Sequence, residues 1–307
     1  MSLPSSLSRS QQGALMLASG GLLMGTMGVF VEEARLGALT LVFFRCLFGF
    51  LSLAAYCGYK GYFARHHFTR RTILLAGLSG VLRVTQWAWF FDAIHRTSIA
   101  VATVVFHVQP FWVVLIGAAL FHERLGLDRI GWIAIAFSGL VLTSGIAGAG
   151  ALQGHTDYLI GIGEALAGSV LYASVTLIAK SLGDLRPHLL TLAQCGVGVV
   201  CLPFIAPLGA VDHIAPVQWF WLIGMGVLHT GLSYVLIYGA LPKLSTPAIA
   251  VLLFVYPLTA IAVDAIVYGR ALSGLQMGGM VLIVVASLGV NLGWPLVSVL
   301  KLRAFSR

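Results

Sequence analysis

The stretch from Ser98 to Leu125, SIAVATVVFHVQPFWVVLIGAALFHERL, decides the fold, because a related copy stands at Ser245 to Leu272, STPAIAVLLFVYPLTAIAVDAIVYGRAL. This offset of 147 residues carries Pro110 onto Pro257. Further matched pairs are Gly77 with Gly224, Trp87 with Tyr234, Ala93 with Ala240 and Gly131 with Gly278, and at an offset of 148 Met24 with Tyr172. The chain therefore contains two related halves.

The composition of the chain is that of a membrane protein. Of its 307 residues, 59% are hydrophobic and 9% are charged, whereas a soluble domain has about 25% charged residues. Several apolar runs reach about 20 residues, the length that crosses a hydrocarbon core of about 30 Å. The formal net charge of +8 does not indicate nucleic-acid binding, because Lys and Arg lie in short segments between the apolar runs.

Ten apolar segments are expected to span the membrane. Each must be an α-helix, because lipid offers no hydrogen-bond partner to an open backbone. The ranges are 12–31, 39–59, 72–95, 98–121, 127–147, 157–179, 187–208, 216–241, 246–268 and 273–294. The sequence therefore predicts an all-α membrane protein with ten transmembrane helices, five in residues 1–148 and five in residues 149–307.

The basic residues are distributed unequally between alternate loops. Thirteen fall on one side, namely Arg9, Lys60, Arg65, Arg70, Arg71, Arg124, Arg129, Lys180, Arg186, Lys243, Lys301, Arg303 and Arg307, and three on the other, namely Arg35, Arg96 and Arg270. An excess of Lys and Arg marks the cytoplasmic side of a membrane. We therefore expect a multi-pass protein of the bacterial inner membrane, with both termini in the cytoplasm and the loop from Gly148 to Thr156 outside.

The odd number of spans in each half inverts the second half relative to the first. Inverted repeats are typical of secondary transporters, in which related halves rearrange around one central site. The pattern predicts a carrier, monomeric or loosely associated, that exposes this site alternately to each side. An intramembrane enzyme would need a convergent nucleophile and base or a metal cluster, which the sequence does not show. A passive channel or a receptor fits the paired prolines less well.

The motifs of the third to fifth spans resemble those of the drug/metabolite transporter superfamily, in its EamA-type branch with ten helices. They are the turn from Ala93 to Ser98, the proline at Pro110 and the sequence FHERL from Phe121 to Leu125. Glu123 matches the family pattern, whereas His122 replaces its usual glycine. The resemblance implies a basket of helices around a central cavity, lined chiefly by spans 1, 3, 4, 6, 8 and 9.

The resemblance also implies a class of solute. The superfamily transports amino acids, nucleotide sugars, phosphorylated metabolites and drugs, and bacterial members with this layout, such as the YddG-type aromatic amino acid exporters, often export amino acids. It therefore implies an exporter of small metabolites, with bulky or aromatic amino acids expected first. A proton-coupled drug or nucleotide-sugar transporter is the alternative. Met24 and Tyr172 stand where members often carry tryptophan, which implies that they line the cavity.

Arg83 lies near the middle of the third span, where an ionisable side chain is costly to bury and therefore indicates a functional or pairing role. Its guanidinium suits a carboxylate, which it can bind with two hydrogen bonds, and Trp87 follows on the same helical face. The repeat pairs Trp87 with Tyr234, and His107 with Phe254. We expect these five residues, with the two that the resemblance adds, to bind the solute. The alternative is that Arg83 pairs with an internal acid and only holds helices together.

The fourth span carries His107 three residues before Pro110, which frees a backbone carbonyl and bends a helix. His107 is expected to contact the solute or to carry a proton, and a packing role is the alternative. Glu164 is the second candidate for proton coupling because it is the deepest acid. The alternative is structural, namely an ion pair of Arg45 with Asp92 or Glu164, which lie at similar depth. Pro110 and Pro257 are the predicted hinges.

Metal and cofactor chemistry are not expected. The four cysteines lie within apolar runs and form neither a CxxC motif nor a Cys/His cluster, so the sequence predicts no metal site. The predicted partners are a small solute and the surrounding lipid.

Overall fold

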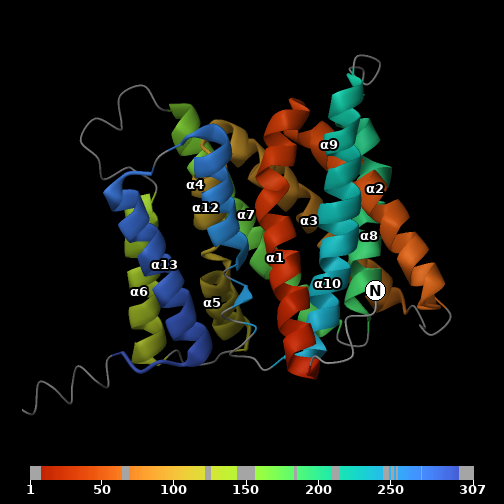
Figure 1. Ribbon diagram of the computed structural model, residues 1–307. Helices are drawn as coiled ribbons and strands as arrows, with labels where there is room; N and C mark the ends of the chain where they lie inside the picture. The colour runs from red at the N-terminus through yellow and green to blue at the C-terminus, as the bar shows by residue number, and fades with distance from the viewer. Residues whose placement is uncertain are drawn as a thin grey trace, which may run out of the picture.

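A computed structural model describes residues 8–63, 69–121, 126–143, 156–182, 185–208, 214–244, 249, 252–253, 255–270 and 272–296, and every regular element in these ranges is a helix (Figure 1). The first half contains α1 (Arg9–Ala34), α2 (Ala38–Tyr59), α3 (Arg70–Arg96), α4 (Ile99–Phe106), α5 (Gln109–Phe121) and α6 (Leu127–Thr143). The second half contains α7 (Thr156–Ser181), α8 (Pro187–Cys201), the 3₁₀ turn η2 (Leu202–Phe204), α9 (Pro216–Gly226), the π-helix η4 (Val227–Leu232), α10 (Ser233–Ala240), the 3₁₀ turn η5 (Leu241–Lys243), α12 (Val255–Tyr268) and α13 (Gly274–Leu292).

Seven helices, some continuing through adjoining helical turns, are long and apolar enough to cross a membrane. Three shorter apolar helices, Ile130–Thr143, Val255–Tyr268 and Gly274–Gly289, accompany them. Each of the ten ranges expected from the sequence overlaps one of these segments, which confirms an all-α membrane protein. The exact number of spans and the cytoplasmic placement of the termini stay predictions.

Four helices begin at a residue whose side chain satisfies a free backbone N–H group of the first turn. The hydroxyls of Ser8, Thr69, Ser98 and Ser273 accept hydrogen bonds from the first turns of α1, α3, α4 and α13. At Ser8 and Ser273 a glutamine side chain accepts the return bond, which completes a capping box. The polar residues between apolar runs therefore fix where the helices begin.

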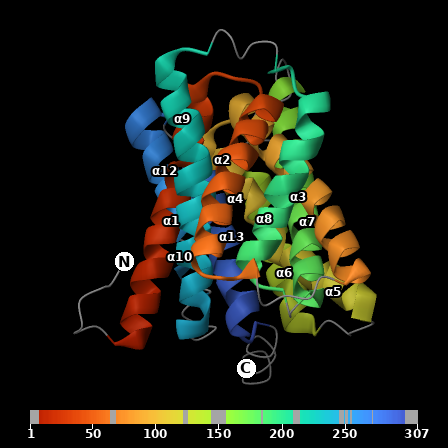
Figure 2. The same ribbon diagram turned by 90° about the vertical axis from the view of Figure 1, so that its right-hand side faces the viewer.

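The two halves run in opposite directions through the bundle. α1 begins at the lower end in Figure 1 and reaches the upper end near Glu32, whereas α7 begins at the upper end, where Asp157 binds Arg96. α13 ends at the lower end, the end at which α1 begins (Figure 2). We call the upper end, which carries the ion pairs of Arg96 and Arg270, the ion-pair end.

Small residues let the helices approach closely, as is usual in membranes. α3 packs along α7, α6 along α13 and α2 along α8, although these partners are distant in sequence. A methyl group at Gly226 would clash with Phe48, and one at Gly198 would clash with Cys46. The high glycine content therefore serves helix packing, and it holds α2 against the π-helix and its neighbours.

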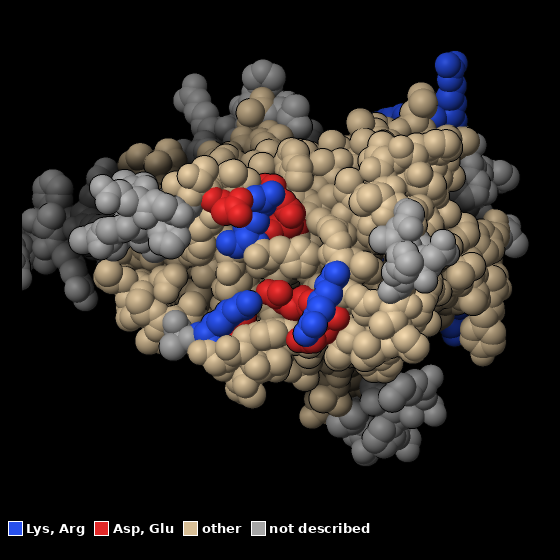
Figure 3. All heavy atoms as spheres, turned by 90° about the horizontal axis from the view of Figure 1, so that it is seen from above, with Lys and Arg blue, Asp and Glu red and all other residues tan. Residues whose placement is uncertain are grey.

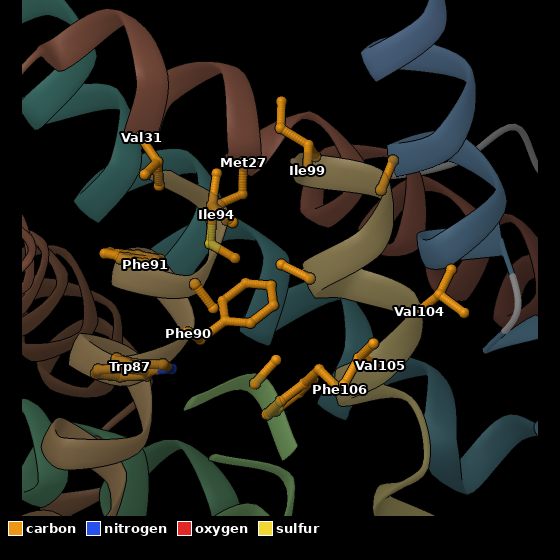
Figure 4. Packing of buried hydrophobic residues seen from close by; sticks show 14 of the residues in the cluster. Met27, Val31, Trp87, Phe90, Phe91, Ile94, Ile99, Val104, Val105 and Phe106 are labelled. Atoms are coloured by element: carbon orange, nitrogen blue, oxygen red, sulfur yellow. The ribbon is translucent and has the colours of Figure 1, made fainter. Parts of the chain in front are cut away.

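A hydrophobic layer fills the bundle below the ion-pair end. It consists of Val31, Phe90, Phe91, Ile94 and Ile99, each 2% exposed or less. Figure 4 shows these residues at one level of the bundle on α1, α3 and α4, with Phe90 pointing from α3 toward α4. The layer separates the ion-pair end from the middle of the bundle.

Candidate functional site

A cavity of about 240 Å³ lies in the middle of the bundle, below the hydrophobic layer. Helices from both halves line it, with the side chains of Leu17, Met24, Met27, Arg45, Arg83, Gln86, Trp87, Phe90, Phe106, His107, Gln109, Tyr172, Tyr234, Ile237, Tyr238, Leu252, Leu253, Tyr256 and Ser287, together with Gly21. Trp87, Phe90 and Phe106 on its inner wall are at most 5% exposed, whereas Leu253 is 50% exposed. The cavity is therefore closed toward the ion-pair end.

The structure brings most of the predicted site residues together around this cavity. Met24, Arg83, Trp87, His107, Tyr172 and Tyr234 all line it. Phe254 lies outside the described residues, although its neighbours Leu253 and Tyr256 are part of the lining. That these side chains bind a solute stays a prediction.

Arg83 is buried among aromatic rings and an amide. Its Nη1 donates a hydrogen bond to Gln86 Oε1 at 3.3 Å. Its guanidinium carbon lies 4.7 Å from the ring centre of Tyr172 and 5.8 Å from that of Trp87. Arg83 Nε is buried and has no hydrogen-bond partner in the described structure, where no carboxylate forms an ion pair with this side chain either. The guanidinium is therefore available to an anionic group in the cavity.

Arg45, from α2, is a second guanidinium at the same cavity. The side chain is 1% exposed, and its Nε donates to Thr230 Oγ1 at 3.0 Å. Its guanidinium carbon lies 4.1 Å from the ring centre of Trp87. The alternative in which Arg45 pairs with Asp92 or Glu164 is wrong, because these carboxylates lie instead 2.8 Å and 3.4 Å from Arg96. Arg45 and Arg83 therefore both lack an ion pair in the described structure.

The repeat extends into the lining of the cavity. Three matched pairs face it together: Met24 with Tyr172, Trp87 with Tyr234, and Gln109 with Tyr256. The lining is nevertheless chemically one-sided, because both guanidiniums come from the first half. A site of this kind can bind a solute in one orientation while the scaffold around it retains its approximate symmetry.

The helix of the fourth span is interrupted beside the cavity. α4 ends at Phe106, and α5 begins at Gln109, directly before Pro110. In this break the His107 Nδ1 donates to the Thr103 carbonyl at 2.6 Å, which leaves its Nε2 free for a polar partner. The matching Pro257 is the third residue of α12. Both prolines thus lie at the start of a helical segment, and their role as hinges stays a prediction.

Arg96 forms the first cluster of the ion-pair end. Its Nε lies 2.8 Å from Asp92 and 3.4 Å from Glu164, and its Nη1 binds Asp157. This cluster joins the end of α3 to the start of α7. Glu164 therefore lies away from the cavity, and its part in coupling stays a prediction.

Arg270 forms the second cluster, next to the first on the same face (Figure 3). Its Nη1 lies 3.1 Å from Glu32 and 3.2 Å from Asp264. The other oxygen of Asp264, which is 1% exposed, accepts a hydrogen bond from the backbone of Ala100 at 3.1 Å. Partial burial opposes the charge on Arg270, but the two carboxylates outweigh it and raise the pKa of the guanidinium. The cluster therefore ties α1, α4 and α12 together through a permanent charge.

Sequence reasoning did not assign several polar groups to the lining, among them Arg45, Gln109 and Tyr256. Arg45 was considered as an ion-pair partner because it lies at a similar depth in the membrane to Asp92 and Glu164. Its position inside an apolar run could have marked it as a site residue, as the same feature did for Arg83. Gln109 and Tyr256 could have been found from the repeat, because each is adjacent to a matched proline. Gln86 lies three residues after Arg83, a spacing that places both on one helical face.

Known proteins share both the sequence and the fold. The model of the EamA-like transporter family matches the chain twice, over residues 11–145 and 159–292. An uncharacterized transporter of Bacillus subtilis, YxxF, is 32% identical over 85% of this chain and 83% of its own length. A threonine/homoserine exporter of Salmonella typhimurium, RhtA, is 27% identical over 93% of this chain and 88% of its own.

Two further comparisons agree with these. A probable amino-acid metabolite efflux pump of Salmonella typhimurium is 27% identical over 71% of this chain and 76% of its own length. A crystal structure superposes with a TM-score of 0.58 over 91% of this chain and 96% of its own at 19% identity, which supports the fold alone. The two matches of the family model agree with the two repeats. The chain therefore belongs to the EamA-like transporter family, and it is a multi-pass membrane transporter of a small solute rather than an enzyme.

Proposed function

We propose that this transporter exports an amino acid with a bulky side chain, or a related metabolite that carries a carboxylate, across a bacterial inner membrane. The observation that carries the proposal is Arg83, a buried guanidinium that lines the cavity and forms no ion pair in the described structure. A guanidinium in such surroundings can bind a carboxylate with two parallel hydrogen bonds. The names of RhtA and of the amino-acid metabolite efflux pump support the same class of solute.

The aromatic walls support a solute with an apolar part. Tyr172, Tyr234 and Trp87 surround Arg83, and Tyr234 stacks on Tyr238 with ring centres 5.4 Å apart. Flat rings of this kind contact an apolar or planar side chain well. His107 packs edge-on against Tyr256 in the same lining, with ring centres 5.0 Å apart.

The closure at one end supports alternating access. A hydrophobic layer and two ion-pair clusters close the cavity toward the ion-pair end, which the distribution of Lys and Arg assigns to the outside. Release of the solute would require these contacts to separate while the other end closes. The cavity in this structure thus corresponds to a state that receives its solute from the cytoplasm.

The test is transport by the purified protein in proteoliposomes. A panel of radiolabelled amino acids is measured with and without a pH gradient, alongside a nucleotide sugar and a cationic drug. Saturable uptake of amino acids at millimolar concentration supports the proposal and separates a carrier from a channel. Uptake of the nucleotide sugar or the drug without uptake of any carboxylate solute would overturn it.

A further inference from the structure

The charge around the cavity is not balanced in the described structure. Arg45 and Arg83 lie 4.1 Å and 5.8 Å from the ring centre of the same residue, Trp87. The separation of their guanidinium carbons therefore cannot exceed about 10 Å, the sum of these distances. Among the described residues that line the cavity there is no aspartate or glutamate. Two permanent positive charges thus share one small, largely apolar space.

The partners of Arg45 are all uncharged. Its Nε donates to Thr230 Oγ1, its Nη1 lies 3.0 Å from Met27 Sδ, and the rings of Trp87 and Phe91 flank its guanidinium at 4.1 Å and 5.5 Å. These contacts orient the side chain and stabilise its charge through the ring faces. They do not neutralise that charge, which is costly to bury without a counter-charge.

The arginines of the ion-pair end make a useful internal comparison. Arg96 is surrounded by three carboxylates and Arg270 by two. Where this chain uses an arginine to join helices, it therefore supplies the counter-charge from its own side chains. At the cavity the described structure supplies none, which indicates that the counter-charge arrives with the solute.

We propose that the solute carries two carboxylate groups, with Arg83 binding one and Arg45 the other. This inference rests on the proposed export of a carboxylate solute and narrows its class. An amino acid with a single carboxylate would neutralise one guanidinium, while its ammonium group would meet the second positive charge without an acidic partner in the described lining. A solute with two carboxylates pairs with both guanidiniums, so no positive group of the solute has to lie against the second arginine.

The fixed position of Arg45 supports this assignment. Thr230 lies in the π-helix η4, and such local widenings of a helix are frequent at functional sites. Gly49 leaves room for the Thr230 side chain, because a methyl group there would lie 2.7 Å from Thr230 Cγ2. The irregular helix and the glycine together hold the hydroxyl that orients Arg45.

Pairs of solutes that differ by one carboxylate test the inference on purified protein. Glutamate is compared with glutamine, and succinate with succinamate, by the shift in melting temperature and by counterflow in proteoliposomes. We expect the member with two carboxylates to compete at least about tenfold better in each pair, because it alone pairs both guanidiniums. Equal competition by both members would overturn the inference and leave the proposed function in place, whereas no binding or uptake of any carboxylate solute would overturn both.

Two variants locate the second charge. Arg45→Gln should reduce the preference for the second carboxylate to near unity, and Arg45→Lys should restore part of it. Thr230→Val keeps the charge and the approximate shape, so it covers the case in which Arg45→Gln does not fold, and it should lower the same preference. An unchanged preference in folded Arg45→Gln or in Thr230→Val overturns the inference, and so does faster counterflow of glycerol 3-phosphate than of either dicarboxylate.

Discussion

Thr230 Oγ1 accepts a hydrogen bond from Arg45 Nε at 3.0 Å, and Thr230 is the residue that the repeat matches with Arg83. In the first half this position carries the charge that faces the cavity, and in the second half it carries the hydroxyl that orients the other charge. The two copies have thus diverged into complementary parts of one site. A change at Thr230 should therefore act through Arg45.

Thr230→Val should weaken solute binding by about tenfold or more while the protein still folds. The variant removes one buried hydrogen bond to a charged group, a loss of about 1.5–3 kcal/mol. Thr230→Ser is the matched control, because it retains the hydroxyl, and it should bind nearly as well as the wild type. Titration of the melting temperature with solute measures both, and equal weakening by valine and serine would show that the hydroxyl is not the cause.

Arg270→Gln should loosen the closed ion-pair end. Its loss leaves Glu32 and Asp264 without their cation, so repulsion between the carboxylates favours separation of α1 from α12. A cysteine placed at Val31, which is fully buried, should then react faster with an impermeant maleimide.

The labelling needs two controls. Cys201 is exposed, so the experiment uses a Cys201→Ser background. Arg35→Gln removes a charge at the same end that has no ion pair in the described structure, and it should leave the labelling rate of the Val31→Cys protein unchanged. A rate that is the same in Arg270→Gln and in the parent would rule out a gating role for this cluster.

A pH gradient should not drive uphill transport. The cavity contains no described carboxylate, and Glu164 is held at the ion-pair end by Arg96, so we expect facilitated export driven by the solute gradient. Proteoliposomes with an imposed gradient should reach the same final solute concentration in the wild type and in Glu164→Gln. Accumulation in the wild type that Glu164→Gln abolishes would identify a proton antiporter with Glu164 as the carrier.

Gly279→Ala should destabilise the contact between α6 and α13, whereas Gly278→Ala should not. A methyl group at Gly279 would lie 2.5 Å from the carbonyl oxygen of Gly139, and at Gly278 it would meet nothing within 4 Å. Overpacking of this kind costs about 1–3 kcal/mol. Thermal unfolding in detergent compares the neighbouring variants, and similar melting temperatures for the two would argue against the close helix contact.

The fold could be predicted from the sequence because the membrane restricts the possibilities. Apolar segments long enough to cross the membrane must be helices. The match of Pro110 with Pro257 indicated two related halves. The break after Phe106 agrees with the bend expected from Pro110. The π-helix at Thr230 was not predictable, since it forms where Thr230 contacts Arg45 of another helix. An apolar pattern does not encode such local irregularities.

The site was predicted in part for the same reason. Residues that share a helical face or a repeat position, such as Trp87 and Tyr234, could be assigned to one cavity. The partner of Arg45 could not be predicted, because the depth of a residue in the membrane does not specify which neighbouring helix its side chain faces. In the structure Glu164 lies beside Arg96 and not beside Arg45. Pairing between spans depends on helix rotation, which only the packed structure supplies.

The measurement that tests the central claim most directly is solute binding and transport by Arg83→Ala. Loss of a guanidinium contact with a carboxylate in a low-dielectric cavity costs about 2–5 kcal/mol. We therefore expect nearly complete loss of uptake at millimolar solute, with only partial recovery in Arg83→Lys, because an ammonium lacks the two-pronged geometry. Arg71→Ala, which removes an exposed charge from the same helix, should transport normally. If Arg83→Ala folds as the wild type does and still transports carboxylate solutes at the wild-type rate, Arg83 does not bind the solute.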